Sequence, residues 1–232
     1  MEPLKVTFTF ATPVFKDSEY PIHFDALVAY CVMREAEKYE YENPWQEADD
    51  LSSCIERTDG PDWVWKASKI VFTPASGIQF QNMLRKSDPT LYYEEVGKSW
   101  AGRGATEQNP IGNINPDTFR INTGSGQQRG YQWLAASQWM EKAEAWVIGD
   151  KEVLEGYLNS HIRNVGKVGR NGYGRILSIR VESSDEPEKW RLRVLPQNES
   201  GLPGIQYESV QACIRAPYWK KLERIVAKEP LV

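Results

Sequence analysis

The residues with the clearest chemical potential lie in one run, HIRNVGKVGRNGYGRILSIRV, at positions 161–181. This run holds four glycines and five Lys or Arg side chains, and it contains no acidic residue. Glycine allows the backbone to take positive φ and to approach a ligand closely. Exposed backbone N–H groups beside cations form concave sites for anions such as phosphate. The run therefore predicts contact with a nucleotide or a nucleic acid.

The order of the elements around these glycines argues against a small-nucleotide site. They follow a helix predicted to start at Asp150, its N-cap, and to end near His161, and they precede a strand predicted at 177–182. P-loops and dinucleotide fingerprints run from strand into helix instead. The run also lacks the spacing G-x-x-x-x-G-K-[ST] and the spacing G-x-G-x-x-G. An extended phosphodiester backbone lying along the loop is the better match.

A second group of candidate residues lies at 97–131, where seven glycines and two prolines predict a long loop or a loosely paired hairpin. Aromatic side chains stand close to cations in this segment, which would let bases stack beside positive charge. The alternative is that the aromatic side chains anchor the segment to the core. The candidates for RNA contact in this segment are Lys98, Trp100, Arg103, Arg120, Arg129 and Tyr131.

Composition limits how general such binding can be. The chain has 232 residues, 41% of them hydrophobic and 26% charged, with a formal net charge of -4. These values are typical of a soluble globular protein and exclude a broadly basic nucleic-acid-binding domain. Residues 34–62 hold ten acidic side chains against three basic ones. One region thus repels phosphate while another attracts it, which favours a single oriented path. Within the acidic region, 39–62 is expected to be a surface insertion.

The cysteines and histidines do not predict a metal site or a cofactor. Cys31, Cys54 and Cys213 are far apart, and no C-x-x-C spacing occurs. We expect reduced thiols in or near a core. The start of the chain shows no basic region followed by an apolar run, and no stretch reaches membrane-spanning length. A cytoplasmic protein with no membrane contact is the expectation.

The coarse element order predicts an α+β protein. Alternation at 4–10 indicates a strand with one buried face, and helical spacing follows at 23–38, with His23 expected to pack or cap at its start. Further strands are predicted at 63–74, 143–149 and 189–195, the last with a solvated face of Lys189, Arg191 and Arg193. The order is that of a βαββαβ, ferredoxin-like (RRM-like) core with an insertion in its middle.

The helix, the glycine loop ending in G-Y-G and the following strand resemble the signature of the RAMP superfamily of CRISPR-associated RNA-binding proteins. LKVTFTFATPVF and PIHFDALVAYCVMREAE, near the start, are similar to the first strand and helix of the type IV CRISPR effector subunit of the fifth Cas family. INTGSGQQRGYQ at 121–132 and RAPYW at 215–219 add to the likeness. The resemblance covers most of the chain, but only the glycine loop is superfamily-wide, and 39–62 has no counterpart.

The resemblance implies one RAMP-type domain over 1–232, with a thumb-like insertion at 97–131 and a C-terminal extension at 185–232. It implies a noncatalytic subunit that holds the 5′ handle of the CRISPR RNA and caps the backbone subunits of a ribonucleoprotein. The large subunit would be a further partner, and target DNA would be met only through the complex. The loop residues expected to contact RNA are Arg163, Gly166, Lys167, Gly169, Arg170, Asn171, Gly172, Tyr173, Gly174 and Arg175.

Two alternatives stay open. Some relatives in the superfamily are metal-independent endoribonucleases, and His161, Tyr157 and Lys167 have the chemistry to move protons in such a reaction. A structural or phosphate-contacting role for His161 is favoured, so no catalytic residue is expected. The other alternative is a protein–protein adaptor in which the glycine loop is only a tight turn.

Overall fold

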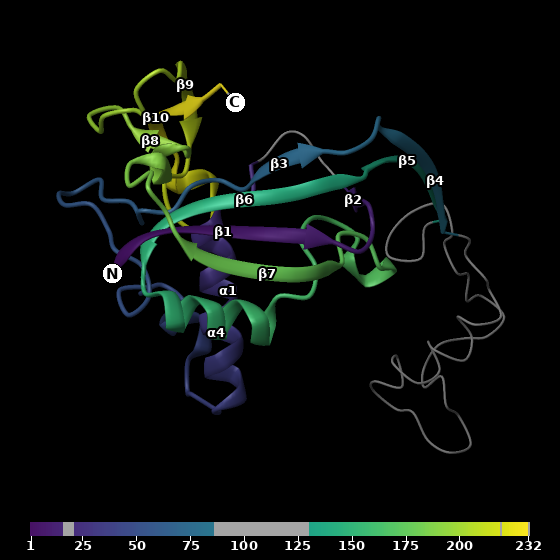
Figure 1. The fold of residues 1–232 in the computed structure, drawn as a ribbon, viewed down its shortest axis with the longest axis horizontal. Coiled ribbons are helices and arrows are strands. Elements are labelled where there is room, and N and C mark those ends of the chain that lie inside the picture. The colour runs from purple at the N-terminus through teal and green to yellow at the C-terminus, as the bar shows by residue number, and fades with distance from the viewer. Residues whose placement is uncertain (16–20, 86–129, 219, 232) are drawn as a thin grey trace, which may run out of the picture. The chain divides into compact units, whose positions relative to one another are not determined.

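The structure is a computed structural model that describes residues 1–15, 21–85, 130–218 and 220–231. Contacts divide the chain into two compact units, Met1–Gln79 with Ala136–Val232, and Phe80–Ala135. The first unit contains the main sheet, the helices and the C-terminal strands (Figure 1). Within the described ranges, no helix has both the length and the apolar character needed to cross a membrane.

A four-stranded antiparallel sheet forms the centre of the first unit. Its strands are β1 (Glu2–Phe10), β3 (Val71–Pro74), β6 (Met140–Gly149) and β7 (Ile176–Ser183), in the spatial order β3-β6-β1-β7. At the middle of β1, Val6 lies opposite Ala145 of β6 and Val181 of β7. The strands predicted at 4–10, 143–149 and 177–182 are confirmed, although β6 begins earlier.

The alternation in β1 has the expected packing consequence. Leu4, Val6 and Phe8 are fully buried, whereas Lys5 and Thr7 between them stay partly exposed. Successive side chains of a strand point to opposite faces of the sheet, so one face of β1 belongs to the core.

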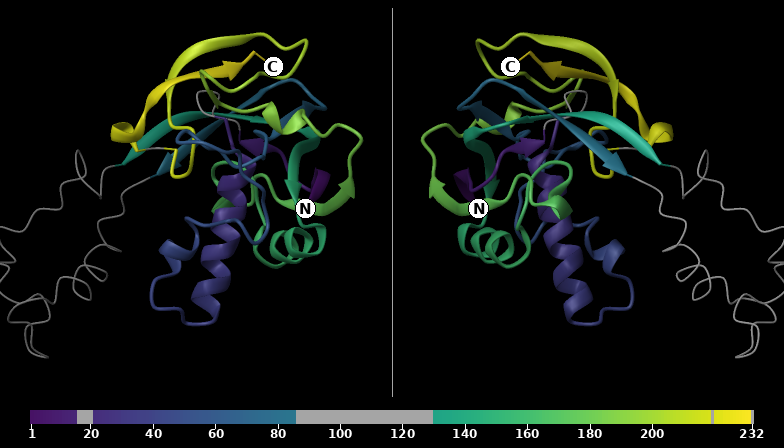
Figure 2. Two further views of the ribbon diagram at one scale, coloured as in Figure 1. Left: turned by 90° about the vertical axis from the view of Figure 1, so that its left-hand side faces the viewer. Right: turned by 90° about the vertical axis from the view of Figure 1, so that its right-hand side faces the viewer.

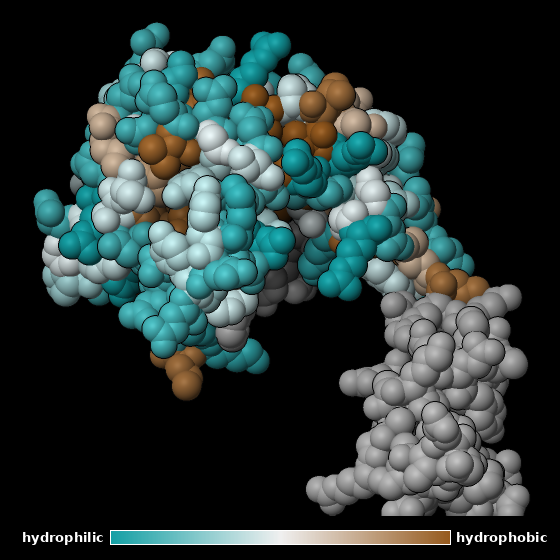
Figure 3. All heavy atoms as spheres, turned by 90° about the horizontal axis from the view of Figure 1, so that it is seen from below, coloured by the Kyte–Doolittle hydropathy of each residue, from teal (hydrophilic) through white to brown (hydrophobic). Residues whose placement is uncertain are grey.

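Two helices cover this buried face. α1 (Phe24–Lys38) and α4 (Lys151–His161) lie on the same side of the sheet (Figures 1 and 2). Asp150 caps α4 as predicted, because its carboxylate accepts a hydrogen bond from the Val153 N–H at 3.0 Å. The apolar stripes of both helices join the main core. When the molecule is seen from below the view of Figure 1, its surface shows mostly hydrophilic side chains, with hydrophobic ones in separate patches (Figure 3).

The acidic segment 39–62 has an exposed outer part and buried anchors. The short helix α2 (Pro44–Glu47) contains no buried residue. Leu51, Cys54 and Ile55 are instead buried in the main core. The segment is thus attached to the core through its second half.

All three cysteines are free thiols with buried side chains. Burial raises the pKa of Cys31 and of Cys54 to about 12, so both stay protonated at neutral pH. The prediction of reduced, buried thiols is confirmed. Among the residues that the structure describes, no group of three or more His, Cys, Asp or Glu side chains is placed to hold a metal ion.

The strand predicted over 63–74 is shorter in the structure, where only β3 is regular. Residues 64–68 lie between the segment around Glu56 and strand β6, and their backbone groups bond to one and then to the other. The Lys66 N–H donates to the Glu56 carbonyl at 2.7 Å, and the Lys66 carbonyl accepts from the Ile148 N–H at 2.9 Å. Because the segment changes partners along its length, it makes single bridges instead of a continuous ladder.

The strand predicted at 189–195 is wrong. Lys189–Arg191 forms a 3-10 helix, η2, and β8 is confined to Leu195–Pro196. β8 pairs with β10 (Ile225–Pro230), which pairs with β9 (Tyr207–Ala212), and the sequence did not predict these last two strands. The sheet closes over a second apolar cluster, whose buried members are Val64, Trp190, Val194, Leu195, Ile214 and Ala227.

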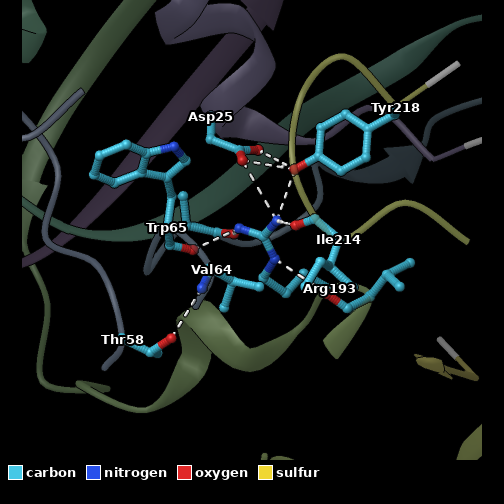
Figure 4. A network of polar contacts seen from close by, with 9 residues as sticks. Asp25, Thr58, Val64, Trp65, Arg193, Ile214 and Tyr218 are labelled. Carbon is cyan, nitrogen blue, oxygen red and sulfur yellow. Dashed lines mark hydrogen bonds and ion pairs between the residues drawn. The ribbon is translucent and has the colours of Figure 1, made fainter. Parts of the chain in front are cut away.

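The solvated basic face expected for 189–195 is also wrong at Arg193, whose side chain is 0% exposed. Its guanidinium donates to the carbonyl oxygens of Trp65 at 2.5 Å and Ile214 at 2.8 Å (Figure 4). It also donates to the Tyr218 hydroxyl at 2.6 Å and lies 3.4 Å from a carboxylate oxygen of Asp25. Burial acts to lower the pKa of Arg193, but Asp25 and Tyr218 outweigh it and raise that pKa. The guanidinium is buried because these acceptors satisfy it.

A third small sheet contains β2 (Val14–Phe15), β5 (Tyr131–Gln138) and β4 (Gln79–Arg85), hydrogen-bonded in the order β2-β5-β4. Val14 lies opposite Gln138, so β2 pairs with the end of β5. The insertion expected at 97–131 lies almost wholly outside the described residues.

Candidate nucleic-acid interface

The glycine loop lies between α4 and β7, as the sequence predicts, and its two ends are closed against each other. The Val165 N–H donates to the Gly174 carbonyl at 2.9 Å, and the Ile176 N–H donates to the Arg163 carbonyl at 2.9 Å. A bridge between Asn164 and Arg175 lies between these bonds. The chain therefore leaves the core and returns to it at one point.

The residues after β1 hold the second half of the loop. The Gly174 N–H donates to the Pro13 carbonyl at 2.8 Å, and the Arg175 N–H donates to the Thr12 hydroxyl at 2.9 Å. The same hydroxyl donates to the Gly172 carbonyl at 2.7 Å. The loop is thus supported by backbone and hydroxyl groups from residues near the start of the sequence.

β2 holds the first half of the loop. Phe15 forms a bridge with Lys167, and its ring meets the ring of Tyr173 edge-on, with centroids 5.0 Å apart. Phe15 is buried, whereas Tyr173 is half-buried. The contact contributes about 1 kcal/mol beyond the burial of the rings. Tyr173 therefore has a packing role that is independent of any ligand.

Two glycines are required by the close packing of this support. Gly174 has φ of +60°, and a Cβ there would lie 1.9 Å from the Val165 carbonyl oxygen. Gly166 has φ of +95°, and a Cβ there would lie 3.1 Å from the Phe15 carbonyl oxygen. Val168 also has positive φ, at +60°, immediately before the 3-10 turn η1 (Gly169–Asn171). Positive φ and close packing therefore determine the backbone conformation of the loop.

Four polar side chains of the loop are exposed at the surface. Lys167, Arg170, Asn171 and Arg175 are exposed. In the part of the chain that the structure describes, no carboxylate lies within ion-pair distance of Arg170 or Arg175. Arg163 is also exposed and donates to the Asn159 carbonyl at 3.3 Å. The structure thus brings the predicted cations together on one hydrogen-bonded loop, and their contact with RNA stays a prediction.

His161 does not stand free beside the loop. Its Nε2 lies 2.5 Å from a carboxylate oxygen of Glu35, so it joins the end of α4 to α1. The hydrogen bond from His161 lowers the pKa of Glu35. Tyr157, one turn earlier in α4, packs against the core, and burial raises its pKa. Tyr157 and His161 therefore share one face of α4 near Glu35, whereas the bridge to Phe15 places the backbone of Lys167 beside β2.

Most candidates of the second group cannot be placed. Lys98, Trp100, Arg103, Arg120 and Arg129 lie outside the described residues. For Tyr131 the structure gives only its backbone, at the start of β5.

The residues that sequence reasoning missed are those that support the loop, namely Thr12, Pro13 and Phe15, together with Glu35. A hydroxyl and an aromatic residue just after the first strand carry no local signal of such a role. Their function depends on a contact that spans 160 residues of chain in the case of Thr12 and Gly172.

These observations define a class: an α+β protein that presents a cationic glycine loop between a helix and the edge strand of an antiparallel sheet. The model of the family described as CRISPR type IV associated protein Csf3 matches residues 2–230. The chain belongs to this family, and the predicted type IV CRISPR association is confirmed. The comparison with curated proteins finds no match.

Proposed function

We propose that this chain is a noncatalytic CRISPR RNA-binding subunit of a type IV effector ribonucleoprotein. In this role it holds the 5′ handle of the guide RNA and caps the backbone subunits. Membership in a type IV CRISPR-associated family supports the general setting, which implies CRISPR RNA and other subunits as partners.

The observation that carries the proposal is that the glycine loop exposes cations on a backbone held by hydrogen bonds. Lys167, Arg170 and Arg175 are exposed on a loop whose backbone is fixed by Pro13 and Thr12. Cations on a fixed backbone bind a phosphodiester chain with little ordering cost. Single-stranded RNA is commonly held by such phosphate contacts together with stacking of splayed bases.

The arrangement of the main sheet supports a ferredoxin-like core for the same subunit. Along the chain the four strands of this sheet and the two helices that cover it follow the order β1, α1, β3, β6, α4, β7, which is the βαββαβ pattern. In space the order β7-β1-β6-β3 places the first and last strands side by side. We further propose that 97–131 is the thumb and that 185–232 is a C-terminal extension of this core.

The decisive experiment is to purify the tagged chain with its native assembly and sequence the RNA that accompanies it. We expect one population of short RNA with a fixed 5′ end. Recovery of the other type IV subunits without RNA would contradict the proposal and favour a protein–protein adaptor.

A further inference from the structure

A groove of about 850 Å³ opens on the side of α1 that faces away from the main core. α1 lines it with Ala26, Tyr30 and Met33, which recur at helical spacing on one face. Trp45 of α2 lines it from the acidic segment, and Pro217 from the C-terminal region. Three segments that are far apart in the sequence therefore build one apolar groove.

Two large aromatic side chains of this groove are exposed. The exposed fraction is 70% for Trp45 and 45% for Tyr30. On the opposite side of α1, Phe24, Val28 and Cys31 are fully buried in the main core. Large aromatic residues, Trp and Tyr above all, are the side chains that dominate binding energy at protein interfaces. The groove thus presents anchor residues without burying them.

The charge around the groove identifies the kind of occupant. Residues 39–50 carry Glu40, Glu42, Glu47, Asp49 and Asp50 and contain no Lys or Arg. Among the described residues that line the groove, Asp49 and Lys220 carry charge. The acidic rim is therefore the one on the α2 side, which the exposed segment 39–50 supplies, whereas the C-terminal side carries Lys220. The acidic rim repels the phosphates of a nucleic acid and attracts a basic partner.

We propose that this groove binds a segment of a neighbouring protein subunit, with apolar side chains in the groove and Lys or Arg side chains against the acidic rim. The proposal rests on the proposed function as part of a multisubunit ribonucleoprotein. It separates two surfaces of one chain: the cationic glycine loop for RNA and the acidic, aromatic groove for protein. Aromatic anchors surrounded by complementary charge are typical of specific protein interfaces.

Photo-crosslinking in the assembled complex tests the occupant directly. Tyr30 is replaced by benzoylphenylalanine, which keeps an aromatic side chain at a half-exposed position. We expect a crosslink to a peptide of another type IV subunit that contains apolar and basic residues. The same replacement at Val226, 53% exposed on β10, is the control and should not give this product. A crosslink to RNA or to a second copy of this chain, or no crosslink at position 30, would overturn the proposal.

Truncation of the two anchors tests their energetic role. The chain is co-expressed with the other type IV proteins and CRISPR RNA, and retention of each subunit on the tagged chain is measured. Trp45→Ala and Tyr30→Ala should each weaken retention of one protein subunit about 10-fold. RNA binding by the isolated variants and their Tm should stay near wild type, because Trp45 is largely exposed and Tyr30 is half-exposed. Trp139→Ala, at another exposed tryptophan, is the matched control.

The outcomes separate the two proposals. If the wild-type chain recovers neither RNA nor another type IV subunit, the proposed function fails and the groove proposal fails with it. If the wild-type complex assembles and both groove variants assemble equally well, only the groove proposal is wrong. An equal loss in Trp139→Ala would also overturn it, because the effect would not belong to the groove.

Discussion

A methyl group on Gly174 would lie 1.9 Å from the carbonyl oxygen of Val165, so the two backbones approach too closely for any side chain. Gly174→Ala should lower the free energy of unfolding by about 3–5 kcal/mol, because strain at positive φ and steric overlap add. Gly172 is the matched control, since its φ is also positive, at +88°, but nothing lies within 4 Å of a Cβ there. Gly172→Ala should cost only about 1–2 kcal/mol. Equal urea midpoints for the two variants would contradict the close approach.

The double variant Lys167→Ala with Arg170→Ala tests the loop as a phosphate-binding surface. We expect affinity for a CRISPR repeat RNA to fall about 10-fold, because two cations are removed from one surface. The slope of log K against log salt concentration, which is negative, should become less steep by about 1.4, at about 0.7 for each contact with single-stranded phosphate. Fluorescence anisotropy at several salt concentrations measures both. Lys221→Ala with Arg224→Ala removes the same charge from exposed positions elsewhere and should leave the slope unchanged.

The contact between His161 and Glu35 leads to a prediction about catalysis. Because His161 serves to join α4 to α1, we expect repeat RNA to remain full-length at high protein concentration, with or without divalent metal. Denaturing gel electrophoresis is the measurement. Cleavage that disappears in His161→Ala, while the variant stays folded and still binds RNA, would establish the nuclease alternative instead.

The buried pair of Arg193 and Asp25 should be essential for stability. Arg193→Met leaves the Asp25 carboxylate buried without its cation and should cost about 3–5 kcal/mol. Adding Asp25→Asn should recover part of this loss, because the uncompensated charge is removed. Arg180→Met, at an exposed position of β7, should change stability by less than about 0.5 kcal/mol. Urea unfolding of the four proteins, wild type included, compares these values, and a double variant less stable than Arg193→Met would argue against the pair.

His23 predicts how stability depends on pH. Its ring is stacked on Tyr218 with centroids 4.0 Å apart, and burial, Arg193 and Lys69 hold its pKa well below the ordinary value of 6.5. As the pH falls below 6.5, the unfolded chain binds a proton that folded His23 does not bind. Stability therefore falls with falling pH, by up to about 1.4 kcal/mol per pH unit.

His23→Phe keeps an aromatic ring against Tyr218 and removes the titrating group. The Tm of this variant relative to wild type should therefore rise as the pH is lowered from about 7.5 to about 5. Differential scanning calorimetry at several pH values measures the difference. Parallel curves for the two proteins would show that His23 does not contribute.

Much of the fold could be predicted because its signals are local. β1 is visible in the alternation of Leu4, Val6 and Phe8, and α4 in its apolar spacing and its N-cap, Asp150. These patterns act within a few residues, where backbone preference and burial agree. The glycine loop could be located for the same reason, since its glycines and cations lie in one uninterrupted run.

The sequence by itself determined which residues form the loop and which elements surround it. The spacing of apolar residues and the capping residue of a helix depend only on residues that are close together in the sequence. Only the tertiary structure decided that Thr12 supports the loop, that His161 binds Glu35 and that Arg193 is buried. Arg193 alternates with apolar residues as in a surface strand, and its burial depends on acceptors supplied by Asp25, 168 residues earlier. The hydrogen-bond partners of a buried polar side chain come from segments that are far apart in the sequence and lie together only in the folded chain. The local spacing of residues does not predict which segments these are.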